Sequence, residues 1–152
     1  MPTFNAAGLA LLRQLEACRL TAYPDQAQHW TIGYGHTGPD VVPGLVWTQA
    51  HADAALASDT MRFSTGVAAL LQAPLNDNQF SALVIFAFNI GMGAFAGSTA
   101  LHRVNVSDLA GVPDAMRLFN KVTDPTTHQL VVNQGLVNRR EAEIALWNKS
   151  IA

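Results

Sequence analysis

At 152 residues the chain has the length of a single domain, and a domain of this size buries enough surface to form a hydrophobic core. Hydrophobic residues account for 49% of the chain and charged residues for only 13%, which excludes an intrinsically disordered protein. The formal net charge of −2 gives no basic excess of the kind that nucleic-acid binding uses, so we expect no nucleic-acid partner. We therefore predict one domain over residues 1–152.

The composition also bears on where the chain acts. Cys18 is the only cysteine, so an internal disulfide is excluded, as is usual for proteins made in the cytosol. No run of about 20 apolar residues is present, and we expect no membrane insertion. Residues 1–16, MPTFNAAGLALLRQLE, lack the basic start and the cleavage site of a secretion signal. If the target lies beyond the membrane, another component must release the protein.

The chain is expected to begin with an amphipathic helix. Asn5 is of a residue type that caps helices, and Leu9, Leu12 and Glu16 follow on one face. This spacing places a carboxylate on the stripe that faces the core. A buried carboxylic acid either takes up a proton or pairs with a cation, and desolvation raises its pKa toward the range that general acid catalysis uses. The alternative is a partly exposed glutamate at a frayed helix end.

Residues 19–35 are predicted to form a β-hairpin, with the strands RLTAY and HWTIGYG separated by the turn PDQAQ. Asp25 in the turn is of a type that caps backbone N–H groups, and Thr31 is common in strands, so either alone would be taken as structural. If the hairpin folds back beside the first helix, Glu16, Asp25 and Thr31 converge on one site. Glycoside cleavage needs such a set: an acid on the leaving oxygen and groups that orient water opposite it.

The rest of the chain is predicted to be helical, giving about six to eight helices in all. The predicted segments are 48–71 (two helices, or one bent near 58–60), 76–90, 99–105, 113–122 and 135–149. Asn76 and Gln79 form a capping box for the second of these, which is apolar all round and is expected to be the central buried helix. Asn89 near its end needs a polar partner. On the last helix Arg140 shares the apolar face, and Arg139 does not.

Other chemistries are not supported by the sequence. His29 and His36 lie seven residues apart without a third ligand at zinc-site spacing, and the other histidines lie on unrelated elements, so we expect no metal. The segment GMGAFAG (91–97) follows a helix, whereas a dinucleotide-binding loop follows a strand. We therefore expect no dinucleotide-binding loop at this segment. The predicted class is α+β, with a small β-hairpin lobe inserted in a mainly helical domain.

With its residues laid out in this way, the chain resembles the phage-type lysozymes, or endolysins, of glycoside hydrolase family 24. The first match is the spacing of Glu16, Asp25 and Thr31 within RLTAYPD and TIGYGHT. The second is PLNDNQFSALVIFAFNIGMGAFAGSTALHRVN (74–105), which is similar to the central helix of the family and the turn after it. The third is GLVNRREAEIALW (135–147), like the closing helix of the family. These segments run across nearly the whole chain.

The resemblance implies the lysozyme fold, with a cleft between a β lobe and a helical lobe. It also implies a muramidase that hydrolyses the β-1,4 bond between N-acetylmuramic acid and N-acetylglucosamine in peptidoglycan. Glu16 would be the general acid, while Asp25 and Thr31 would hold and activate the attacking water; no cofactor or metal is implied. The expected protein is a monomer of a phage or prophage lysis system, made in the host cytoplasm, released by a holin-type protein and active in the periplasm.

Two positions depart from the family pattern. Ala17 follows the candidate acid where the family usually has glycine, and Gln28 replaces a glycine in the hairpin. If Gln28 takes a positive φ, the conformation costs about 1–2 kcal/mol. These departures affect the expected position of Asp25 and leave the identity of the acid unchanged.

Two supporting pairs are also expected. Arg140 is the cation that we would place near Glu16, and the alternative is an intrahelical pair with Glu143 at i+3. His36, just beyond the hairpin, is expected to pair with Asp59 and to tie the two lobes together. The Arg140 pair would adjust the pKa of the acid, and the His36–Asp59 pair would add stability.

Two other functions fit the same residues. A lytic transglycosylase uses a similar fold and acid but closes an anhydro ring without water, and Asp25 and Thr31 favour hydrolysis because ring closure needs no water-holding pair. A non-catalytic wall-binding module that kept the fold is the second alternative. The intact set of acid, aspartate and threonine argues against it.

Overall fold

The computed structural model of the chain describes residues 1–151 and separates into two compact units. Unit 1 consists of Met1–Leu11 together with the chain from Phe63 onward, and unit 2 consists of Leu12–Arg62. The expectation of one domain over residues 1–152 stays a prediction.

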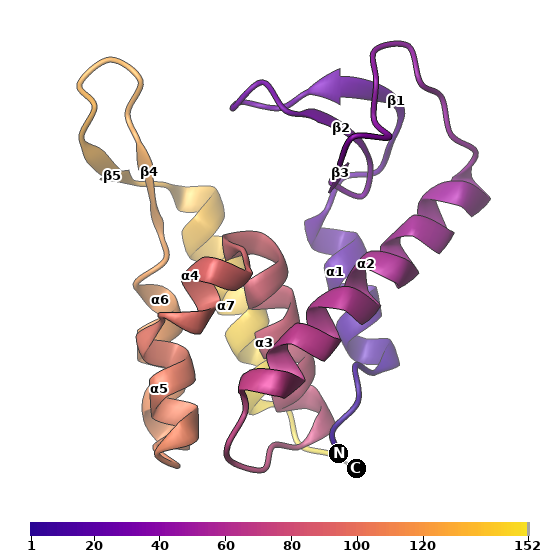
Figure 1. Cartoon of the computed structure of the whole chain (residues 1–152). Helices are drawn as coiled ribbons and strands as arrows, with labels where there is room; N and C mark the ends of the chain where they lie inside the picture. Colours follow the sequence, from indigo (N-terminus) through magenta and orange to yellow (C-terminus); the bar gives the residue numbers. More distant parts are fainter. Residues whose placement is uncertain (152) are drawn as a thin grey trace. The chain divides into compact units, whose positions relative to one another are not determined.

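Unit 2 contains a small antiparallel sheet with three strands in chain order, drawn in indigo and purple in Figure 1. The strands are β1 (Arg19–Pro24), β2 (Trp30–Gly33) and β3 (His36–Thr37). The first two form the predicted hairpin, and β3 is an additional strand that hydrogen bonds to β2. Tyr23 lies opposite Thr31 in the register of β1 and β2, so the candidate threonine is fixed in the middle strand.

A buried apolar cluster lies against this sheet. It is made of Ile32, Val41, Trp47 and Ala52. Ala52 belongs to the start of α2 (Gln49–Leu70), where Thr48 Oγ1 accepts the His51 N–H at 3.1 Å. The segment expected to be bent or divided is one continuous helix of 22 residues, so the two-helix alternative was wrong.

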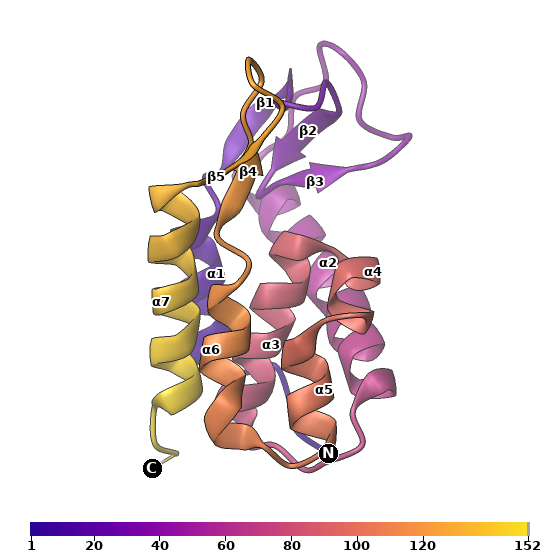
Figure 2. The same ribbon diagram turned by 90° about the vertical axis from the view of Figure 1, so that its left-hand side faces the viewer.

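Unit 1 is mainly helical. Its elements are α3 (Asp77–Ile90), α4 (Met92–Ala96), α5 (Thr99–Asn105), a 3₁₀ turn (Leu109–Gly111), α6 (Val112–Arg117), β4 (Lys121–Thr123), β5 (Leu130–Val132) and α7 (Gln134–Asn148). α3 packs against α7, and α6 contacts both α5 and α7 (Figure 2). β4 and β5 pair as a separate antiparallel ribbon.

Helix α3 forms the core of unit 1, as the sequence predicted. The capping box is present, because Asn76 accepts the Gln79 N–H and the Gln79 side chain accepts the Asn76 N–H. Phe86 is fully buried and meets Phe95 and Phe119 edge to face, with ring centroids 6.3 and 5.2 Å apart. Although α3 is strongly apolar, no helix within residues 1–151 is long and apolar enough to cross a membrane.

The N-terminal segment packs on the first turns of α3. Asn5 caps α1 (Ala6–Leu15) as predicted, accepting the Gly8 N–H at 2.9 Å. The Asn5 N–H donates to Ser81 Oγ at 3.0 Å, and the Asn5 amide donates to Asn78 Oδ1 at 2.8 Å. A Cβ on Gly8 would lie 2.7 Å from Ser81 Cβ, so this close approach of the two helices requires glycine.

The segment after α5 differs from its prediction. The helix expected over 113–122 ends at Arg117, and the chain then enters the β4–β5 ribbon. Valine and threonine dominate the two strands, and these β-branched residues favour extended structure. Asp124 closes the intervening turn, because its Oδ1 accepts the N–H groups of Thr126 and Thr127 at 2.8 Å each.

Gln28 in the β1–β2 turn has a φ of 65°, so the strain anticipated at this position is present. A left-handed conformation costs about 1–2 kcal/mol with a side chain, and the greater freedom of glycine in the unfolded state offsets part of this cost. Gln28→Gly should therefore raise the free energy of unfolding by about 0.5–1 kcal/mol in urea denaturation. Gln26→Gly, in the same turn at negative φ, should not stabilise. A Gln28→Gly protein no more stable than its parent would contradict this account.

Candidate active site

Glu16 lies where α1 ends and the chain turns toward β1. The helix assignment stops at Leu15, but the Glu16 N–H still donates to the Leu12 carbonyl at 2.9 Å. Leu12 is fully buried, whereas Glu16 is half-buried and lies one residue beyond the helix, so it matches the alternative of a partly exposed glutamate at the helix end. The last helical hydrogen bond therefore fixes the backbone of the candidate acid.

The Glu16 carboxyl lies against the turn that joins β2 to β3. This turn consists of Tyr34 and Gly35, and Gly35 has a φ of 82°. A Cβ placed on Gly35 would lie 3.4 Å from Glu16 Oε2, so the Cα of the glycine faces the carboxyl directly. The sequence marked Gly35 only as the end of the β region. The signal that it belongs to the site is its position in TIGYGHT, between the candidate threonine and His36.

Asp25 organises the β1–β2 turn. Its Oδ1 accepts the N–H groups of Ala27 and His29 at 2.8 Å each, which is the backbone role that aspartate commonly plays in turns. Its Oδ2 lies 3.6 Å from His29 Nδ1, and the Asp25 side chain is 35% exposed. One carboxylate oxygen therefore holds the turn while the other faces a more open environment.

Thr31 is joined to Asp25 through the backbone of His29. The His29 carbonyl accepts both the Thr31 hydroxyl at 3.0 Å and the Asp25 N–H at 2.8 Å. Because the Thr31 hydroxyl donates its proton there, its lone pairs remain oriented as hydrogen-bond acceptors. Thr31 is only 4% exposed, so its rotamer is fixed by packing. The structure thus links Asp25 to Thr31 at one end of β2 and sets Glu16 against the turn at the other end.

His36 pairs with Asp59, as predicted. His36 Nδ1 lies 2.8 Å from Asp59 Oδ2, and Nε2 lies 3.0 Å from Asp40 Oδ2. Burial by itself would lower the pKa of His36, but the hydrogen bonds to Asp59 and Asp40 outweigh it and raise the pKa above its ordinary value. Both partners belong to unit 2, so this pair joins β3 to α2 within one unit and does not tie two lobes together as expected.

Arg140 forms the intrahelical pair that was the alternative to a position near Glu16. Arg140 Nε lies 2.7 Å from Glu143 Oε1, and the two side chains are 1% and 0% exposed. Arg140 Nη2 also donates to Asn89 Oδ1 at 2.5 Å, which supplies the partner that this asparagine needed. Burial raises the pKa of Glu143 and lowers that of Arg140, whereas their mutual attraction opposes both shifts.

Arg139 was expected to lie off the apolar face of α7, and this expectation was wrong. Its side chain is 9% exposed and its Nε lies 3.3 Å from Glu143 Oε2. A fully buried carboxylate is costly unless cations surround it, so Glu143 draws arginines from i−3 and i−4 inward together. An analysis of apolar periodicity does not detect this second arginine, since charge and not hydrophobicity places it.

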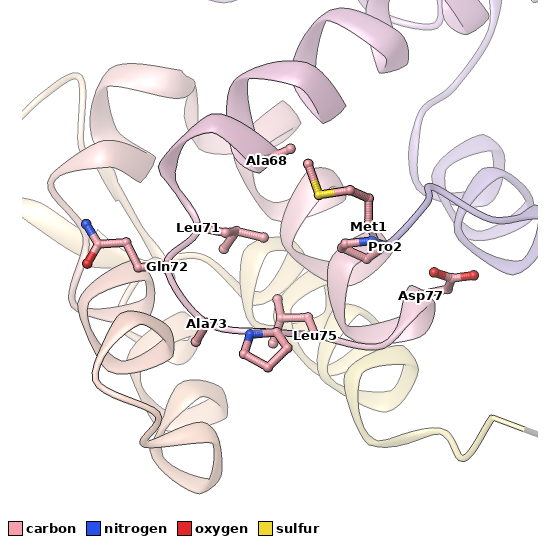
Figure 3. Close-up of a pocket in the computed structure, with 9 residues that line it drawn as sticks. Met1, Pro2, Ala68, Leu71, Gln72, Ala73, Leu75 and Asp77 are labelled. Carbon is pink, nitrogen blue, oxygen red and sulfur yellow. The ribbon is translucent and has the colours of Figure 1, made fainter.

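A hollow of about 500 Å³ in unit 1 is lined by none of the three candidate residues (Figure 3). It is lined by Met1, Pro2, Ala68, Leu71, Gln72, Ala73, Pro74, Leu75 and Asp77. Asp77 accepts the Thr3 N–H at 2.8 Å and the Thr3 hydroxyl at 3.1 Å, so its carboxylate anchors the N-terminal segment. We therefore assign this hollow no catalytic role.

Comparison with protein families gives a match to the family model described as phage lysozyme, over residues 13–143. The matched range contains Glu16, Asp25 and Thr31.

Individual relatives are similar along nearly the whole chain. An endolysin of Bacillus phage PZA is 40% identical over 146 residues, covering 95% of this chain and 54% of that protein. The chain thus spans about half the length of that relative. An endolysin of Acyrthosiphon pisum secondary endosymbiont phage 1 is 36% identical, with 94% and 96% coverage. Among solved structures, the muramidase domain of SpmX from Asticaccaulis excentricus superposes with a TM-score of 0.91 at 34% identity, covering 99% of this chain and 100% of that one.

The His36 pair should make stability depend on pH. Because the folded-state pKa lies above the ordinary value of 6.5, the stabilisation is complete below the unfolded-state pKa and is lost as pH rises through the folded-state pKa. In urea unfolding between about pH 5.5 and 8.5, the decline in the free energy of unfolding should be weaker in Asp59→Asn than in Asp40→Asn. The Asp59 side chain is 13% exposed and the Asp40 side chain 59%, so water screens the Asp59 pair less. Equal pH dependence in the parent and Asp59→Asn proteins would refute the assignment.

The buried cluster on α7 should be essential for folding. Glu143→Gln removes the buried carboxylate that pairs with Arg140 and Arg139, and breaking such a pair typically costs about 3–5 kcal/mol. Glu141→Gln breaks an exposed pair with Arg117, 2.6 Å long, and should cost less than about 1 kcal/mol. Thermal and urea denaturation measure both changes. Similar losses in the two variants would show that Glu143 does not hold the cluster together.

Proposed function

Because the chain belongs to the phage lysozyme family, we propose that it is a muramidase that hydrolyses the β-1,4 bond between N-acetylmuramic acid and N-acetylglucosamine in peptidoglycan. Family membership confirms the predicted enzyme class, a lysozyme-type glycoside hydrolase of phage lysis, and the predicted α+β lysozyme-like fold. The observation that carries the proposal is the half-buried Glu16 carboxyl held against Gly35, in the same unit as Asp25 and Thr31.

Glu16 is the proposed general acid. In this role its protonated carboxyl donates to the glycosidic oxygen as the bond to the leaving sugar breaks. Gly35 supports the role because a backbone without a side chain lets the turn lie against the carboxyl. The last hydrogen bond of α1 comes from the Glu16 N–H, so the helix holds the backbone of the acid.

Asp25 and Thr31 are the proposed water-holding pair. The Oδ2 of Asp25 accepts one proton of the attacking water and takes it up as the new C–O bond forms, while the Thr31 hydroxyl oxygen accepts a hydrogen bond from the other proton. Their links to His29 support this assignment, because a turn closed by two N–H bonds to Oδ1 holds the remaining oxygen in a defined direction. The glycosidic bond and one water are consumed, and two hydroxyl groups are produced.

The proposed partner is the glycan strand of the cell wall, with no nucleic acid and no membrane insertion. A net charge of −2 provides little long-range attraction to anionic wall polymers, so short-range contacts must supply most of the affinity. We propose that the chain is a monomer, made in the host cytoplasm and active on the wall in the periplasm after release by a holin-type protein. The similarity to phage endolysins supports this setting.

Replacing the proposed acid tests the function. Glu16→Gln keeps the shape of the side chain and removes its transferable proton, so the rate of turbidity loss of chloroform-treated Gram-negative cells should fall by about 10²–10⁴-fold. Glu141→Gln makes the same chemical change on the exposed face of α7 and should retain the parent rate. Equal clearing by the Glu16→Gln and parent proteins would instead indicate a wall-binding module without chemistry.

A further inference from the structure

A hydrogen-bonded network in unit 2 centres on Asp53, a residue to which the proposed reaction assigns no role. The Tyr34 hydroxyl donates to Asp53 Oδ1 at 3.3 Å and accepts from Gln49 Nε2 at 3.0 Å. Gln49 Nε2 also lies 3.0 Å from Asp53 Oδ1. Asp53 and Gln49 lie one turn apart at the start of α2, so one end of this helix holds the phenol hydroxyl from two sides.

Tyr34 is also held through its ring. The ring packs against the buried cluster of unit 2, which includes Ile32 and Trp47. The residue occupies the first position of the two-residue turn between β2 and β3, and Gly35 occupies the second. Because glycine has no side chain of its own, Tyr34 supplies the only side-chain anchor that this turn can have. Fixing Tyr34 therefore fixes the backbone that faces the Glu16 carboxyl.

The helix that carries Glu16 reaches the same anchor. Arg13 in α1 has its Nη2 3.8 Å from Asp53 Oδ1, the oxygen that also meets Tyr34 and Gln49. The Arg13 and Asp53 side chains are 45% and 40% exposed, so their attraction is screened and orients the helix only weakly. Even so, the β2–β3 turn and α1 are both oriented by the same carboxylate on α2, that of Asp53.

We propose that Tyr34 and Asp53 are positioning residues that hold the β2–β3 turn against Glu16 and thereby set the direction of the proton that it donates. The inference rests on the proposed function, since it concerns the same acid. Neither residue touches the reacting atoms. A small displacement of an acid from the leaving oxygen slows the chemical step while substrate binding is retained, so positioning separates kcat from KM.

Tyr34→Phe tests the proposal because it keeps the ring packing and removes only the hydroxyl. The control is Thr123→Val, which likewise removes one hydroxyl and keeps the shape of the side chain, on the exposed strand β4 of unit 1 and outside the network. On purified peptidoglycan, Tyr34→Phe should lower kcat by about 3- to 10-fold and leave KM within about two-fold of the parent. Asp53→Ala should have the same effect in the same direction.

A second measurement follows the turn itself. ¹⁵N relaxation of the parent, Tyr34→Phe and Thr123→Val proteins should show increased motion of the Gly35 amide in Tyr34→Phe alone. Unchanged Gly35 relaxation, or a kcat equal to that of Thr123→Val, would overturn the positioning role. A fall in melting temperature without the kcat effect would do the same. If the parent does not degrade peptidoglycan, the proposed function fails and the inference fails with it. If the parent and the control are active and Tyr34→Phe is unaffected, only the inference is overturned.

Discussion

The close approach of the Glu16 carboxyl to the Cα of Gly35 is the contact on which the rest of the candidate site depends. It requires a glycine, because a φ of 82° is strained for any other residue. It also requires the short strand β3, which follows the turn and pairs with β2, and the end of α1, where Glu16 lies. The small sheet is therefore the element that gives the carboxyl its surroundings.

Charge is scarce in this chain, and two groups of charges show different uses of it. On α7, the buried Glu143 carboxylate pairs with both Arg139 and Arg140 within one helix, an arrangement that serves stability. In unit 2, the carboxylates of Asp25 and Asp53 instead bind backbone and side-chain donors that shape turns. Asp25 shows that the structural and catalytic interpretations of a turn aspartate are compatible, since each involves a different oxygen.

The sequence predicted best where local chemistry determines structure. The caps at Asn5 and Asn76 and the β1–β2 hairpin were predicted because side-chain oxygens and turn residues act within a few positions. The β4–β5 ribbon was missed because apolar residues such as Phe119 continue a helical spacing beyond Arg117, where the helix actually ends. The anchoring of Tyr34 depends on Gln49 and Asp53, 15 and 19 residues away, which a local pattern cannot reveal. The inward position of Arg139 follows from its pairing with Glu143 at i+4, which apolar periodicity does not detect. The set of candidate catalytic residues came from their spacing and from the family resemblance together.

The account is tested most directly by the product of the reaction. If Glu16 donates the proton and Asp25 and Thr31 deliver water, digestion of peptidoglycan in ¹⁸O-labelled water should release muropeptides whose reducing ends carry the heavy oxygen, as read by mass spectrometry. Anhydro-muropeptides, lighter by one water and free of the label, would contradict it by showing that the acid works without a water-holding pair.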